Sequence, residues 1–101
     1  KNIDLAISNY LLAVQYNNKS YDTYYRLANL HNSLENYENA KEMSRKSLFI
    51  KSAYAPASYE LGIAEKNLGN TLAAIKAFRN SARDTKWRKL SNHEIQILEK
   101  K

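Results

Sequence analysis

Apolar residues recur along this chain at intervals of three and four, the period of a helix that buries one face. Six such stretches follow one another, separated by short breaks that contain Asn, Ser or the single glycine Gly69. The first expected helix covers about residues 3–16, and the next five begin near Ser20, Asn36, Pro56, Asn70 and Ser91. No stretch shows strand alternation or a hairpin dipeptide. The pattern predicts an all-α fold of about six helices.

The breaks carry start and stop signals of particular kinds. Asn2, Asn36 and Asn70 each precede an apolar-periodic stretch, where an Asn side chain can cap a helix. Gly69 stands where a left-handed C-terminal cap is expected. The run Ser91-Asn92-His93-Glu94 has the spacing of a capping box, so we expect it to open the last helix.

The chain repeats itself at the constant interval that separates Asn2 from Asn36 and Asn36 from Asn70, a period of 34. Short breaks force consecutive helices to lie antiparallel, and this period, built from helix–turn–helix units, is typical of a solenoid. The positions that recur are Asn2, Asn36 and Asn70, then Ala6, Ala40 and Ala74, and also Leu27 and Leu61.

These residues resemble the tetratricopeptide repeat family, which has Leu-Gly and Tyr in its first helix and Ala-x-x-x-aromatic in its second. Leu61-Gly62, Gly69, Ala74 and Phe78 match this pattern closely. The looser matches are Tyr24, Leu27-Ala28, His31 and Ala40, and the departures are Ser44, Ser58 and Glu65. The resemblance covers about residues 1–86 and implies one domain, 1–101, built as a right-handed α-solenoid. Its expected parts are the second helix of a truncated repeat (1–18), two repeats (21–52 and 55–86), and a capping helix or the start of a next repeat (90–101).

In such an array the small residues have packing roles. Gly62 and Ala28 are expected to let a facing backbone approach closely, and Phe78 to fill the space between repeats. His31 lies on the packing stripe, where it replaces the family's tyrosine, so we expect it to be structural.

Composition excludes several functions. The chain has no cysteine, which removes thiolate metal sites and Cys nucleophiles, and its two histidines are far apart in sequence. No phosphate loop, metal-ligand cluster or acid–base pair is recognisable, so we expect no catalytic residue, no metal and no cofactor. No apolar run reaches the length of a membrane span. The net charge of +6 favours acidic partners.

The remaining candidate chemistry is an interaction surface. Successive first helices should line a concave wall suited to an extended peptide or a partner helix. The expected partner-binding residues are Tyr25, Asn29, Asn32, Tyr59, Ile63, Lys66, His93 and Ile97. We therefore expect a non-catalytic protein-interaction scaffold, with Tyr25 and Tyr59 as neighbours on the wall.

Some tetratricopeptide proteins clamp the acidic tails of chaperones with Lys, Asn and Arg. The clamp positions here hold Tyr25, Asn29, Glu60, Leu90 and Glu94. Only Asn29 agrees and two positions carry the opposite charge, so we expect no chaperone-tail clamp.

Two features leave alternatives open. The run Lys86, Trp87, Arg88, Lys89 can be a nucleic-acid or acidic-protein patch, or Trp87 can simply fill the last gap between repeats. A pentatricopeptide-like RNA-binding repeat favours a period of 35, so nucleic acid is the weaker alternative.

Leu5, Leu11 and Leu12 make the first helix apolar nearly all round. This helix can mediate homo-oligomerisation, or it can pack on further parts of a longer protein for which this segment is a spacer. Because the chain starts without Met, inside a repeat, we expect it to be a piece of such a protein.

Overall fold

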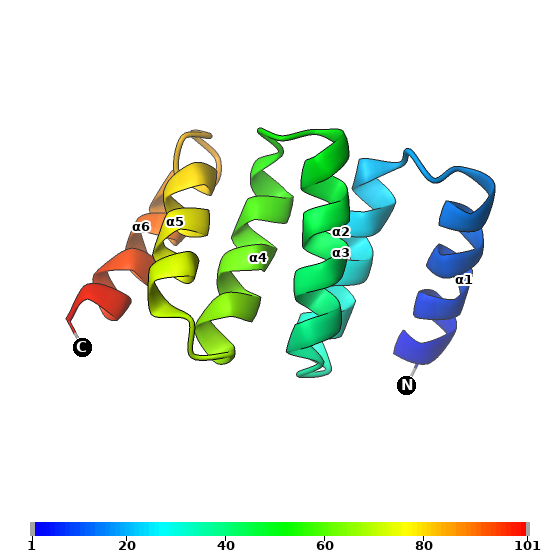
Figure 1. Cartoon of the computed structure of the whole chain (residues 1–101), viewed down its shortest axis with the longest axis horizontal. Helices are drawn as coiled ribbons and strands as arrows, with labels where there is room; N and C mark the ends of the chain where they lie inside the picture. Colours follow the sequence, from blue (N-terminus) through cyan, green and yellow to red (C-terminus); the bar gives the residue numbers. More distant parts are fainter. Residues whose placement is uncertain (1, 101) are drawn as a thin grey trace.

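Six helices follow one another in a row (Figure 1). The computed structural model describes residues 2–100, and within that range it contains no strand. The helices are α1 Ile3–Tyr16, α2 Tyr21–Ser33, α3 Tyr37–Ile50, α4 Ala55–Asn67, α5 Thr71–Ser81 and α6 Arg88–Glu99. The predicted all-α fold is confirmed.

Consecutive helices lie antiparallel and each packs on the next, while α2 also contacts α4. In Figure 1, α3 lies in front of α2 and α5 in front of α6, and the α1–α2, α3–α4 and α5–α6 turns share one edge. The described part of the chain measures 41 × 26 × 19 Å. Helix hairpins thus stack along one direction as an α-solenoid, as the repeat predicts.

The recurring small residues form the buried contacts. Ala28, Ala40 and Ala74 are fully buried, and so is Phe78. A Cβ atom placed on Gly62 would stand only 2.5 Å from the Phe78 ring. Gly62 therefore makes room for an aromatic ring, whereas the sequence led us to expect a close approach of backbone.

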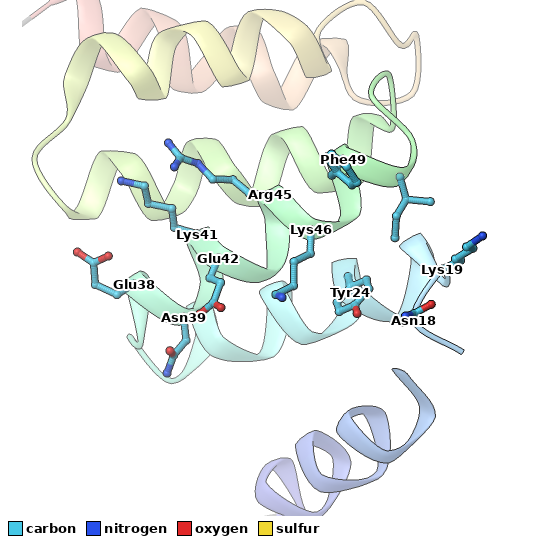
Figure 2. A pocket seen from close by; sticks show the side chains of 11 residues that line it. Asn18, Lys19, Tyr24, Glu38, Asn39, Lys41, Glu42, Arg45, Lys46 and Phe49 are labelled. Carbon is cyan, nitrogen blue, oxygen red and sulfur yellow. The ribbon is translucent and has the colours of Figure 1, made fainter. Parts of the chain in front are cut away.

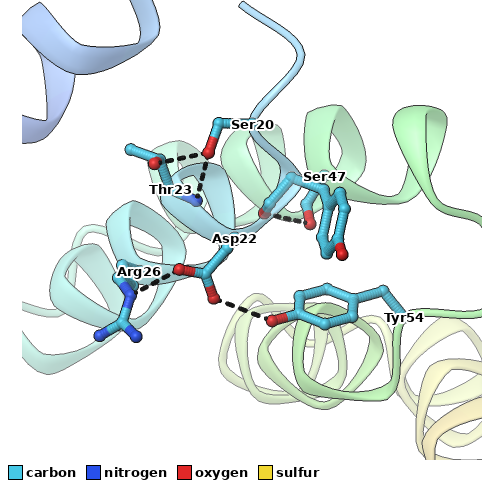
Figure 3. A network of polar contacts seen from close by, with 7 residues as sticks. Ser20, Asp22, Thr23, Arg26, Ser47 and Tyr54 are labelled. Carbon is cyan, nitrogen blue, oxygen red and sulfur yellow. Dashed lines mark hydrogen bonds and ion pairs between the residues drawn. The ribbon is translucent and has the colours of Figure 1, made fainter. Parts of the chain in front are cut away.

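The sequence predicts that three asparagine side chains cap helices, and this prediction is right in position but wrong in the hydrogen bond. Asn2, Asn36 and Asn70 occupy the N-cap positions, but none uses its side chain to cap the helix. The Asn70 amide instead donates to the Glu65 carboxylate over 2.8 Å. Ser20, which precedes α2, does cap its helix, because its hydroxyl accepts from the backbone N–H of Thr23 (Figure 3).

Two helices end in the same left-handed turn. Gly69 has a φ of 84° and its N–H donates to the carbonyl of Lys66, while the N–H of Asn70 donates to the carbonyl of Glu65. This bond pair is a Schellman motif, and it confirms the predicted role of Gly69. Glu35, at the equivalent position of the preceding repeat, makes the corresponding turn at a φ of 62° without being glycine.

The capping box predicted at Ser91 is also wrong. Helix α6 begins at Arg88, and Ser91 is fully buried with its Oγ 2.6 Å from the Oγ of Ser81. Arg88 donates to the carbonyls of Ala82 and Arg83, which satisfies acceptors beyond the end of α5. The helix starts early because these tertiary contacts outweigh the local cap signal.

Candidate functional site

The repeat period of 34 aligns α6 with α2 and α4, and we call the exposed side of these three helices the first-helix face. Helix α2 packs on α4, whereas α6 packs mainly on α5. The repeat register aligns residues of this face from one repeat to the next. The aligned rows are Tyr25, Tyr59 and His93, then Asn29, Ile63 and Ile97, then Asn32 and Lys66. All eight of these residues are those expected from the sequence to bind a partner.

Two polar contacts of equal spacing join the helices of this face. Asn32 Nδ2 donates to Glu60 Oε1 over 2.8 Å and also to the Glu60 carbonyl. Lys66 Nζ pairs with Glu94 Oε1 at 2.9 Å. Lys66 and Glu94 are the residues that follow Asn32 and Glu60 by one repeat period of 34. Asn32 and Lys66 therefore hold neighbouring repeats together, a role the sequence reading did not give them.

Glu60 is the least expected member of the face. Its side chain is buried, with 5% of the residue exposed, and Asn29 donates to its second carboxylate oxygen over 3.0 Å. Within residues 2–100 no Lys, Arg or His forms an ion pair with it. Nearby, the Oδ1 atom of Asn32 is buried without a hydrogen-bond donor. The cluster thus has more acceptors than donors.

The other buried carboxylate, Glu65, is compensated quite differently. Lys41 lies 3.4 Å and Arg45 3.6 Å from its oxygens, on the side of α4 that faces α3. The Arg45–Glu65 pair recurs in the next repeat as Arg79–Glu99 at 3.1 Å. Glu60 is therefore exceptional among the buried acids in having only amide partners.

The tyrosines of the face pack against other rings. Tyr25 meets Tyr54 edge-on at 5.9 Å, and Tyr59 lies 5.4 Å from Phe78 and 5.2 Å from Trp87. Tyr25 and Tyr59 do not form an aromatic pair with each other within the described residues. Burial raises the pKa of Tyr25, and the charge of Glu60 raises it further. Burial, and then the charges of Glu94 and Glu60, raise the pKa of Tyr59.

The remaining expected residues differ in exposure. Ile63 is half-buried and packs against the α5–α6 core, whereas His93 is exposed and Ile97 is 39% exposed. His31 is half-buried on the packing side, where burial lowers its pKa while Glu42 opposes that shift. This environment agrees with a structural role for His31.

A polar and aromatic cluster at the α2–α4 junction escaped the sequence reading. Tyr54 donates to Asp22 over 3.0 Å, and Asp22 also accepts from Arg26 at 2.8 Å (Figure 3). The Tyr21 ring contacts Tyr54, and Lys51 Nζ stands 4.7 Å above Tyr21. Burial and the hydrogen bond to Asp22 raise the pKa of Tyr54 to about 12. The sequence signal for this cluster was the spacing of Asp22 and Arg26, which are four residues apart and can therefore form an ion pair on one face of a helix.

An open hollow of about 1050 Å³ over α3 was also missed (Figure 2). Its lining includes cations and anions on flexible side chains, and Phe49 at its rim is 92% exposed. Ligand pockets hold a small number of fixed polar groups, whereas the charged groups here end long, flexible side chains. A smaller hollow of about 160 Å³ lies between α1 and α2, lined by Ala6, Tyr10, Tyr25, Arg26, Asn29 and Leu30.

The residues of the basic run, 86–89, differ in their exposure and contacts. Lys86 and Lys89 are exposed, but the Trp87 ring is half-buried against Tyr59 and the Arg88 guanidinium is bonded to backbone carbonyls. Trp87 thus fills the gap between the last two first helices. A stacking platform for nucleic-acid bases would need that ring to be free.

Helix α1 carries apolar surface as expected. Leu5, Leu11 and Leu12 are all exposed, and α1 contributes no buried residue. Self-association through these leucines stays a prediction, which light scattering of the chain can test.

Neither a metal centre nor a membrane span is found in the part of the chain that the structure describes. Residues 2–100 contain no group of three His, Cys, Asp or Glu side chains able to hold a metal ion. No helix in this range is long and apolar enough to cross a membrane.

Comparison with known proteins agrees with the architecture. A family model described as tetratricopeptide repeat matches residues 21–54, which cover α2, α3 and the turn into α4. A comparison with curated proteins gave no match. Tetratricopeptide repeats generally mediate protein–protein interactions. Residues 21–54 thus form a tetratricopeptide repeat, set within a row of stacked helix hairpins that share its period.

Proposed function

We propose that the chain is a non-catalytic scaffold that binds an extended peptide or a partner helix on the first-helix face. The supporting observation is the alignment of aromatic, amide and aliphatic side chains on three helices in register. Aromatic and aliphatic groups supply contact area. The exposed Asn29 donates one N–H to Glu60 and keeps its second N–H and its carbonyl oxygen for a peptide backbone.

The same face is better suited to this role than the hollow over α3. Contacts between α2 and α4 and between α4 and α6 fix the first-helix face. A wall that is ordered before binding loses less conformational freedom when a partner arrives. Most of the side chains that line the hollow are instead exposed, and several are long and charged.

The experiment selects displayed random dodecapeptides on the full chain and measures their affinities for point variants. Ile97→Ala removes an exposed aliphatic group of the face and should weaken the selected peptides about tenfold. Phe49→Ala is the matched control, because this 92% exposed ring belongs to the rim of the other hollow. Circular dichroism should give the same helix content for both variants.

Two results would contradict the proposal. Peptides that lose affinity on Phe49→Ala but not on Ile97→Ala would place binding over α3. Failure to select any dodecapeptide that is sensitive to Ile97→Ala would exclude the first-helix face as a peptide site.

A further inference from the structure

We infer that the ligand of the first-helix face carries a positively charged side chain, Arg or Lys, that is placed against the carboxylate of Glu60. This inference rests on the proposed function and names the chemistry of the partner. The chain's net charge of +6 predicts the opposite preference, for acidic partners.

The first step is the missing counter-charge. A buried carboxylate is costly unless it is paired with a cation as well as hydrogen-bonded. Glu65 has Lys41 and Arg45, and Glu94 has Lys66, but Glu60 has only the amides of Asn29 and Asn32 among residues 2–100. An approaching cation would supply the compensation that the buried Glu60 lacks within residues 2–100.

The second step is the excess of acceptors. Each Glu60 oxygen accepts a single side-chain amide hydrogen bond, although a carboxylate can accept about four bonds in all. The buried Asn32 Oδ1 has no donor. A guanidinium has five N–H donors in a planar fork and is the group best fitted to such a cluster.

The third step is the aromatic surroundings. The negative charge of Glu60 reaches both Tyr25 and Tyr59, since it raises the pKa of each. Both rings therefore lie in the electrostatic range of the site. Tyr59 adjoins Glu60 in sequence, and Tyr25 stands one helical turn before Asn29, so a ligand cation on this face is also near tyrosine rings, which attract Arg and Lys.

The accessible way in is through Asn29. Its side chain is exposed although its amide contacts Glu60, and it also lines the small hollow between α1 and α2. We expect a rotation of this side chain to free Glu60 Oε2 for the ligand's cation.

The test uses two small probes of equal shape, Nα-acetyl-arginine-N-methylamide and the neutral citrulline analogue. Nuclear magnetic resonance would follow the side-chain amides of Asn29 and Asn32 during each titration. We expect the arginine probe to shift these signals with about tenfold higher affinity than citrulline. Glu60→Gln should remove this difference, whereas Glu38→Gln, which makes the same charge change at an exposed site on α3, should keep it.

The dodecapeptides provide a second measurement. Those selected on the wild-type chain should be enriched in Arg or Lys and should lose about tenfold affinity on Glu60→Gln. Their affinity should stay level or rise from about 50 to about 300 mM salt, because salt screens the repulsion from the positive chain while the buried contact is shielded.

The outcomes separate the two proposals. Peptides that need Ile97 but lack basic residues and bind Glu60→Gln equally well would overturn the inference and leave the proposed function intact. Equal shifts with arginine and citrulline in the wild-type chain would overturn the inference without any variant. Acidic peptides whose affinity falls steeply with salt would overturn it as well.

Discussion

Replacing Gly62 with alanine tests the tightest contact of the core. The new Cβ would stand 2.5–2.7 Å from three atoms of the Phe78 ring, closer than carbon atoms approach without repulsion. The ring has no free space to retreat into, because Phe78 is fully buried and Tyr59 packs against it at 5.4 Å. Either the ring or helix α4 must therefore shift.

Two opposing effects set the magnitude. Overpacking of a well-packed core costs about 1–3 kcal/mol, whereas alanine is better than glycine inside a helix by about 1 kcal/mol. Since the Cβ meets three ring atoms, we place the overpacking near the upper end of its range. The free energy of unfolding should fall by about 1–2 kcal/mol, which lowers the melting temperature by about 4–8 °C per kcal/mol.

Urea unfolding followed by circular dichroism measures this change. The companion variant Ala28→Gly occupies the equivalent position of the preceding repeat, where Ser44 stands in place of the ring of Phe78. Because Ala28 is fully buried, this variant combines the helix preference of glycine with the loss of a buried methyl group, and it should cost about 1–2 kcal/mol. A cycle of Gly62→Ala with Phe78→Leu should show a coupling of about 1 kcal/mol, because the smaller side chain relieves the clash.

An increase in stability on Gly62→Ala would refute the reasoning. So would strict additivity with Phe78→Leu, since it would mean that the two side chains do not compete for the same space.

Three further predictions concern single contacts. Glu35→Gly should raise the free energy of unfolding by about 0.5–1 kcal/mol, because it relieves the left-handed backbone; a loss of stability in urea would contradict this. Tyr54 is neutral below its unfolded pKa of 10.0 and titrates at about 12 in the fold, so its contribution should be complete below pH 10 and be lost as pH rises to 12, with a flatter profile for Tyr54→Phe. Ser81→Ala should cost about 1–3 kcal/mol by leaving the buried Ser91 hydroxyl unpaired, and Ser91→Ala should cost less, because Ser81 still donates to the Phe78 carbonyl; equal calorimetric losses would count against that order.

The fold was predictable because its information is local and repeated. The apolar period gave helices α1 to α5 within a few residues, and recurrence of Ala6, Ala40 and Ala74 gave the stacking. The start of α6 was missed because Ser91 satisfies a local cap rule while its hydroxyl is used by Ser81. Local patterns cannot reveal a partner that lies on another helix.

The alignment of residues along the first-helix face was predictable from the sequence, but the contacts among them were not. The period of 34 predicted that Tyr25, Tyr59 and His93 lie on one side of the array, because equivalent positions of successive repeats share a side. It did not show that Asn32 and Lys66 are engaged with carboxylates on the next first helix along the row. Such pairs become visible in a sequence only when two positions per repeat are compared together.

The exposed helix α1 has a consequence for how the molecule opens. The pairs Arg45–Glu65 and Arg79–Glu99 bind α3 to α4 and α5 to α6, but the corresponding residues of α1 and α2 are Leu11 and His31. Without that ion pair and without a buried side chain, α1 should separate at a small free-energy cost. Its amide protons should then exchange with solvent well before those of α4 and α5, so unfolding proceeds in stages from one end of the row.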